Sequence, residues 1–461
     1  MNYRITAMFA PLALVMTGCG DGSSSGASAP PVATPAPAPT PAPTPPPVVL
    51  TAEGAYPLLA DYRFFPNGFG SPNEQASRPS DRQGRYPVQA GTPMFTTQFG
   101  SVPADYRAVA KTAFGIDTAD GQTAAASAPA GATTVSPLTT LLTGTNTEAR
   151  LERQLGIIGT GFATTADREL LTFVPSAALA SGDANAASDA ERLIMHNIRV
   201  MILAAALQTA ASPPDPSGTK IYNYDGVRRY LEATPNDLFF SNQGLIPFLR
   251  SVDFGGRFPV PVYRDDVVEA AARLIVTYSF AMGLRIESRE EAAQFKLGIW
   301  GYLAPQLTRL FDENSAAAAA RVGAITNADV LNGIAVFGSH PAIDVNDSFF
   351  TQPDFYLIAP GATRVVPPVD EGFNGDGPLN SNDVHAQPSA SDGNHFVPGR
   401  STVTDVSVPA ANAGQVTATR AAHGTVTIRA APGFSGVTFF EYTVSHQQGD
   451  VERARVYVIV F

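Results

Sequence analysis

The chain has 461 residues, of which 44% are hydrophobic and 15% charged, and its formal net charge is −11. This acidic balance argues against a nucleic-acid partner, because phosphate binding needs a basic surface. A single cysteine excludes an intramolecular disulfide. Stability must therefore come from buried apolar surface, and a chain of this length holds roughly two or three domains.

Residues 1–18 have the features of a secretory signal. Arg4 supplies a positive charge, and the apolar run that follows is too short to span a bilayer of about 30 Å. The small residues Thr17 and Gly18 directly precede Cys19. This arrangement resembles the lipobox of bacterial lipoproteins, in which the cysteine is acylated and becomes the mature N-terminus. The alternative is an ordinary secreted protein whose one cysteine is incidental.

The lipoprotein resemblance implies an anchored protein that does not span the membrane. Two or three acyl chains, at about 0.8 kcal/mol per buried methylene, are enough for stable attachment. Gly20 stands where the family's inner-membrane retention signal has Asp, so the resemblance implies the outer membrane. Residues 19–50 hold the lipidated cysteine and a Pro-rich stalk, whose extended part reaches roughly 60 Å at about 3.1 Å per residue.

The next two segments differ in pattern. Residues 51–130 are rich in Gly, Pro and aromatic side chains without helical periodicity, which predicts an irregular, β-rich segment. Residues 131–341 are predicted to form a helical domain. We expect four helices in this domain. The first begins at the capping pair Ser188 and Glu191, and the second covers Asp265–Met282. The third begins at the capping pair Ser288 and Glu291 and is kinked near Pro305, and the fourth covers Asn327–Val336.

The beginning of this helical domain carries a resemblance. The segment APAGATTVSPLTTLL (residues 128–142) is similar to a module of bacterial surface lipoproteins, in which it leads into helices. That module has no assigned catalytic role, so the resemblance implies a class of surface protein and no chemistry.

Residues 342–461 change character again. Short alternating segments such as GTVTIRA (424–430), TFFEYTVS (438–445) and RARVYVIVF (453–461) predict an antiparallel β-sandwich. The alternation places Phe440, Tyr442 and Val444 on one buried face. The expected fold class is thus multidomain α+β, with a helical domain followed by this sandwich.

The same C-terminal residues resemble one cadherin-like, Ig-like repeat of bacterial surface adhesins. GPLNSND (377–383) matches the family pattern GVLxND, and HGTVTIRAAPGFSGVTFFEYTVS (423–445) matches its GxVxYxPxxxFxGxDxFxYxV run. Such repeats bind calcium through acidic side chains, several of which are replaced here. The remaining candidate ligands are Asp344, Asn346, Asp347, Asp354, Asn382 and Asp383. The alternative is that these residues make turns and strand ends.

The sequence lacks the common catalytic motifs HExxH, GxSxG and GxxxxGK[ST], and no enzymatic activity is expected. An aromatic-rich, irregular stretch at 221–263 is the most suggestive feature. Exposed rings there would suit stacking on a sugar or docking a peptide, whereas buried rings would pack loops onto the helical core. The candidate ligand-contact side chains are Tyr222, Tyr224, Tyr230, Phe239 and Phe240.

These features predict a non-catalytic, surface-anchored lipoprotein of the cell envelope with an adhesion or scaffolding role through its Ig-like domain. The alternative is a hydrolase or glycan-binding protein that acts on envelope polysaccharide through the loops at 221–263. The expected partners are the membrane, through the lipid anchor, and a surface polysaccharide or protein. No cofactor is expected apart from calcium at the candidate ligands named above.

We predict that replacing Cys19 with Ser releases the protein from the membrane fraction, because serine offers no thiol for acylation. Cell fractionation of the two chains checks this prediction. Continued membrane association of the Cys19→Ser chain would contradict the anchor.

Overall fold

The computed structural model describes the helical middle and the C-terminal sheets in most detail. It describes residues 133–142, 151, 170, 172–211, 222–234, 240–251, 262–283, 289–338, 354–366, 401–422, 424–446 and 451–460, and short strands at 48–52, 61–64, 78–79, 85–88, 94–97, 126–129, 349–350, 384–389 and 393–398. The chain divides into two compact units, Met1–Thr44 and Pro45–Phe461. The first unit, with Cys19 and most of the predicted stalk, lies outside the described residues.

The fold class is α+β, as the sequence predicts at this coarse level. The described helices occupy the middle of the chain, and antiparallel and mixed β-sheets occupy its C-terminal part. Two small sheets precede the helices, with strand orders β4-β1-β7 and β3-β2-β5-β6. Their strands are β1 (Val48–Ala52), β2 (Asp61–Phe64), β3 (Arg78–Pro79), β4 (Arg85–Val88), β5 (Met94–Thr97), β6 (Ala126–Pro129) and β7 (Thr134–Val135).

The helical region covers residues 137–337. Its α-helices are α1 (Pro137–Thr140), α3 (Pro175–Ala180), α4 (Ala184–Ala211), α5 (Tyr224–Ala233), α6 (Asn242–Ser251), α7 (Asp265–Gly283), α8 (Arg289–Gly298), α9 (Ala304–Glu313), α10 (Ala316–Gly323) and α11 (Asn327–Ile334). A π-helical turn, η2 (Ile299–Leu303), joins α8 to α9, and a 3-10 turn, η3 (Ala335–Phe337), follows α11.

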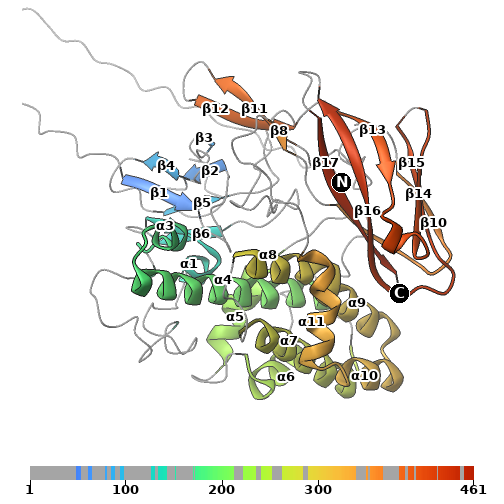
Figure 1. The fold of residues 1–461 in the computed structure, drawn as a ribbon. Helices are drawn as coiled ribbons and strands as arrows, with labels where there is room; N and C mark the ends of the chain where they lie inside the picture. The colour runs from blue at the N-terminus through green and yellow to red at the C-terminus, as the bar shows by residue number, and fades with distance from the viewer. Residues whose placement is uncertain are drawn as a thin grey trace, which may run out of the picture. The chain divides into compact units, whose positions relative to one another are not determined.

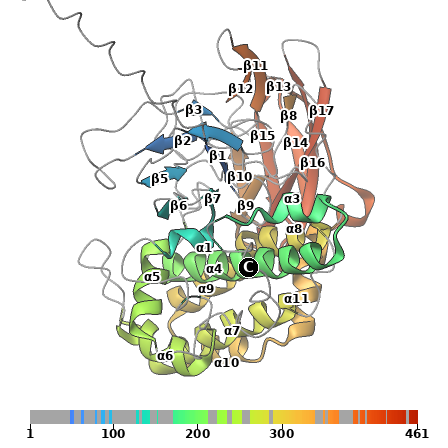
Figure 2. The ribbon, with the colours of Figure 1, turned by 90° about the vertical axis from the view of Figure 1, so that its left-hand side faces the viewer.

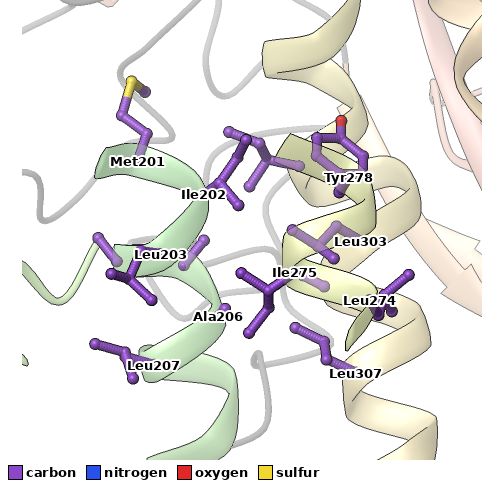
Figure 3. Packing of buried hydrophobic residues seen from close by; sticks show 14 of the residues in the cluster. Met201, Ile202, Leu203, Ala206, Leu207, Leu274, Ile275, Tyr278, Leu303 and Leu307 are labelled. Atoms are coloured by element: carbon purple, nitrogen blue, oxygen red, sulfur yellow. The ribbon is translucent and has the colours of Figure 1, made fainter. Parts of the chain in front are cut away.

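Helix α4 is the central element of this region, because it is buried along most of its length. Its side chains Ile202 and Ala206 point toward Ile275 of α7 and Leu303 of η2 (Figure 3). All four are at most 1% exposed. Helix α7 in turn packs against α6 and α10 (Figure 2). Burying an isoleucine or leucine side chain contributes about 1.5–3 kcal/mol. Packing of this kind supplies most of a helix's stability in a folded protein.

The apolar character of α4 also satisfies the length and hydropathy criteria for a membrane-spanning helix. Within the described parts of the chain it is the one helix that does so, and 89% of its most apolar 18-residue window is buried inside the protein. A soluble core helix has the same properties.

The four predicted helices agree with the structure in position, and the described residues also form helices that were not predicted, among them α3 and α10. Helix α7 begins at Asp265, as predicted, and α4 begins a turn before the expected capping pair. The aromatic-rich stretch at 221–263, predicted to be loops, contains α5 and α6. This prediction was wrong for those residues. Asn223 caps α5 by accepting a hydrogen bond from the backbone N–H of Gly226 at 2.7 Å, a signal that the sequence analysis missed.

The described strands of the C-terminal β region (residues 349–460) form three sheets. Their orders are β10-β15-β14, β12-β11-β8 and β13-β16-β17-β9 (Figure 1). The strands are β8 (Phe349–Phe350), β9 (Asp354–Ile358), β10 (Thr363–Val366), β11 (Val384–Ser389), β12 (Gly393–Pro398), β13 (Ser401–Ser407), β14 (Val416–Arg420), β15 (Val426–Ala430), β16 (Gly436–His446) and β17 (Val451–Val460).

Two of these sheets, β13-β16-β17-β9 and β10-β15-β14, share one apolar cluster. We call the side of each sheet that faces this cluster its inner face. Phe440, Tyr442 and Val444 of β16 lie on the inner face at 0–1% exposure, which confirms the predicted alternation. Strand β9 pairs parallel with β17, so this sheet is mixed and not purely antiparallel as predicted. Gly436 opens β16 with φ +134°, a conformation that favours glycine.

Candidate functional site

The tyrosines predicted to contact a ligand belong to the helical core. Tyr222, Tyr224 and Tyr230 are 4%, 7% and 0% exposed. The ring of Tyr230 packs against that of Phe248, with centroids 4.9 Å apart. A ring buried in this way offers no face to a sugar or peptide, so these three residues are packing residues in this structure. Phe240 is partly buried against the same core, and Phe239 lies outside the described residues.

The hydroxyl of Tyr222 has a specific structural role. Trp300 donates a hydrogen bond from its indole N–H to this hydroxyl at 2.8 Å, and the two rings meet edge to face at 5.2 Å. Tyr222 also stacks on Tyr224. A buried indole needs an acceptor, and Tyr222 supplies it from a segment 78 residues earlier in the chain.

Of the candidate calcium ligands, Asp354 alone lies within the described residues. It is the first residue of β9, partly buried, and pairs with Val456 of β17 in the parallel register. Asp344, Asn346, Asp347, Asn382 and Asp383 lie outside the described residues. In the part of the chain that the structure describes, no group of three or more His, Cys, Asp and Glu side chains is placed to hold a metal ion.

Helix α4 carries a basic stripe that consists of Arg192, His196 and Arg199. Their spacing of four and three residues places them on one face of the helix. His196 is 5% exposed, and its Nδ1 has no hydrogen-bond partner in the structure; the same is true of Arg199 Nε. Burial, reinforced by the neighbouring Arg199 and Arg192 charges, lowers the pKa of His196 to about 3. The imidazole is therefore neutral at neutral pH.

The π-helical turn η2 creates a close contact between the helices. Gly298, at its start, leaves room for the Tyr278 hydroxyl, since a Cβ there would lie 2.3 Å from Tyr278 Oη. That hydroxyl donates a hydrogen bond to the carbonyl of Phe295 at 2.6 Å. The buried Tyr278 hydroxyl thus has a hydrogen-bond partner inside the core. Burial raises the pKa of Tyr278, which keeps the hydroxyl protonated.

Gly301, in the same turn, makes room for a second aromatic ring. A Cβ at Gly301 would lie 2.1 Å from Cζ of Phe337. The Phe337 ring also meets Tyr457 of β17 edge to face at 4.8 Å, and its centroid lies 6.2 Å from that of Phe355 of β9. Phe439 of β16 completes the group, 6.0 Å from Tyr457. We call Gly301, Phe337, Phe355, Phe439 and Tyr457 the ring junction.

A charged pair borders the ring junction. Arg455 of β17 lies 4.3 Å above the Phe439 ring and forms an ion pair with Glu441 of β16 at 3.2 Å. Both charged side chains are largely buried, at 13% and 26% exposure. The cation over the ring and the facing carboxylate allow the arginine to lie beside apolar side chains without losing its electrostatic partners.

Sequence reasoning missed the ring junction because it assigned each strand a single apolar face. One signal was present: residues 456–460 of β17 read VYVIV, with no polar side chain except the tyrosine hydroxyl. A strand that is apolar at every position is buried on both faces.

We predict that Gly301→Ala destabilises the protein by about 1–3 kcal/mol, because the added methyl group collides with the Phe337 ring. The matched control is Gly323→Ala in α10, where a Cβ meets nothing within 4 Å. The control should be neutral, or stabilising by up to about 1 kcal/mol through helix propensity. Urea unfolding of both variants measures the difference, and equal stability of the two would contradict the close contact.

We predict that His196 makes the protein less stable in acid. In the unfolded chain its pKa is about 6.5, so between that pH and about 3 the unfolded state binds a proton that the folded state does not. The free energy of unfolding should fall by about 1.4 kcal/mol for each pH unit in this window. In the variant His196→Gln, which has no titrating side chain at this position, the free energy of unfolding should fall less steeply as the pH is lowered. Unfolding curves from pH 7 to pH 4 test it, and an unchanged pH slope in the variant would refute the assignment.

The chain was compared with protein-family models, with curated proteins and with solved structures. None of the three comparisons gave a match.

Proposed function

We propose that this protein is a lipid-anchored, non-catalytic protein of the bacterial cell envelope, and that its C-terminal β region is an Ig-like domain with an adhesion or scaffolding role. The anchor rests on Cys19 and its sequence context. The Ig-like assignment has additional support from strand order, which is the observation that carries the proposal.

The strand order of the two sheets that share a core corresponds to that of an Ig-like sandwich. If β9, β10, β13, β14, β15, β16 and β17 are lettered A to G in chain order, the orders become B-E-D and C-F-G-A. Ig-like domains place strands A, B, E and D in one sheet and C, F and G in the other. The one departure is strand A, which pairs with G. Strands β11 and β12, the two longer strands of the small sheet β12-β11-β8, lie in the segment of the chain that connects strand B to strand C.

The outer face of the B-E-D sheet is the more open surface for a partner. Thr363, Thr417, Thr419 and Arg429 are exposed there, and Val365 is 61% exposed. The register aligns Thr363, Arg429 and Thr417 across the three strands. Hydroxyl groups and one guanidinium on the outer face of this sheet can donate hydrogen bonds to a polysaccharide or to a protein surface.

A binding screen tests this proposal. The full-length Cys19→Ser protein would be incubated with isolated envelope polysaccharides and with envelope protein extract, and bound partners would be recovered. We expect binding that Arg429→Glu weakens at least about tenfold, because a charge reversal in the centre of the face removes a donor and repels an acceptor. The matched control is Arg273→Glu on α7, an exposed arginine far along the chain from this sheet, which should bind normally.

Three outcomes would contradict the proposal. The first is binding to none of these envelope fractions. The second is binding that Arg273→Glu weakens and Arg429→Glu does not. The third is conversion of the polysaccharide to shorter products, which would favour a hydrolase.

A further inference from the structure

Strand β17 is buried on both of its faces. Val456, Val458 and Val460 point into the core between the two sheets, and the alternate residues Tyr457 and Ile459 lie on the outer face. The outer pair is as buried as the inner set, at 0% and 2% exposure. A free-standing domain of two sheets has polar side chains on its outer faces. Another part of the protein must therefore pack against the outer face of β17.

The ring of Phe337 forms a central part of that packing. It is 2% exposed and contacts Tyr457, and Tyr457 belongs to the same apolar cluster as the buried side chains of the helices. Phe355, Val437 and Phe439, also on outer faces of their strands, pack against this cluster. Gly301 of η2 leaves the space that the Phe337 ring occupies. The side chains at the ring junction thus belong to one continuous apolar core.

The apolar part of the outer face has a definite border. Along the β16–β17 pair, Phe439 lies opposite Tyr457, and the next outward pair is Glu441 opposite Arg455. Beyond it, Thr443 lies opposite the exposed Arg453. Along these two strands, aromatic rings are thus followed by an ion pair and then by an exposed charge. An interface with an apolar centre and a polar rim has this pattern.

We propose that Phe337 couples the helical region and the C-terminal β region into one cooperative folding unit, and that the outer face of β9, β16 and β17 is an internal interface which the protein cannot expose. The β region is then a part of a larger rigid body and not an independent module. This proposal does not depend on the lipid anchor or on any ligand, so it can fail or succeed separately from the proposed function.

The single tryptophan makes a direct test available. Trp300 is the one tryptophan of the chain and lies in η2, so its fluorescence reports unfolding of the helical region. Phe440→Ala removes a ring from the inner face of β16, which belongs to the β cluster and not to the ring junction. In the full chain, kept in detergent, we expect Phe440→Ala to lower the midpoint of the Trp300 thermal transition by about 5 °C or more.

The coupling should disappear when the ring is removed. In a Phe337→Ala background, adding Phe440→Ala should no longer move the Trp300 midpoint. The matched control background is Phe280→Ala, which removes a 59% exposed ring from α7 and should leave the full shift in place. If Phe337→Ala is too unstable to measure, Phe337→Leu keeps an apolar side chain without the ring contacts and should reduce the shift.

Two results would overturn the proposal. One is a Trp300 midpoint that Phe440→Ala leaves unchanged while Phe337 is intact. The other is a shift of the same size in the Phe337 and Phe280 backgrounds, which would show that the coupling does not pass through this ring.

Discussion

The ring of Phe337 lies so close to Gly301 that a Cβ there would collide with it, and it meets Tyr457 edge to face at 4.8 Å. This contact links the helical region to the C-terminal β region. It requires a glycine in the π-helical turn, because a Cβ there would occupy the position of the ring. It also requires a strand that is apolar on both faces, since the other side of that strand fills the core of the β region. Interiors are close-packed, so neither requirement can be relaxed without a void or a collision.

The same contact changes how the C-terminal domain is understood. If the proposed Ig-like domain were an independent module, both of its outer faces would be polar. Here the outer face of strands β9, β16 and β17 packs against the helical region, whereas the outer face of the B-E-D sheet is exposed. In the proposed function, a partner of the domain would therefore meet the exposed B-E-D sheet.

Much of the regular structure was predictable because it depends on local patterns. The start of α7 at Asp265 and the inner face of β16 follow from helical and two-residue periodicity. Helices α5 and α6 were missed because aromatic, Pro and Gly residues at 221–263 concealed an amphipathic pattern, and burial of Tyr222 and Tyr230 was decided by distant partners. The ring junction joins residues from five separate elements, η2, η3, β9, β16 and β17, and no local sequence pattern predicts that these residues meet. The one feature of the sequence that indicated the ring junction was the run in β17 that is apolar on both faces of the strand.

Native-state hydrogen exchange tests the central claim most directly, because it measures the free energy of opening at each amide without any substitution. If the helical and β regions form one unit, the most protected amides of α4 and of β17 should exchange through the same global opening, with equal free energies and equal dependence on denaturant. Protection of β17 that is lost at a clearly lower free energy than protection of α4 would show that the β region unfolds alone and would contradict the account.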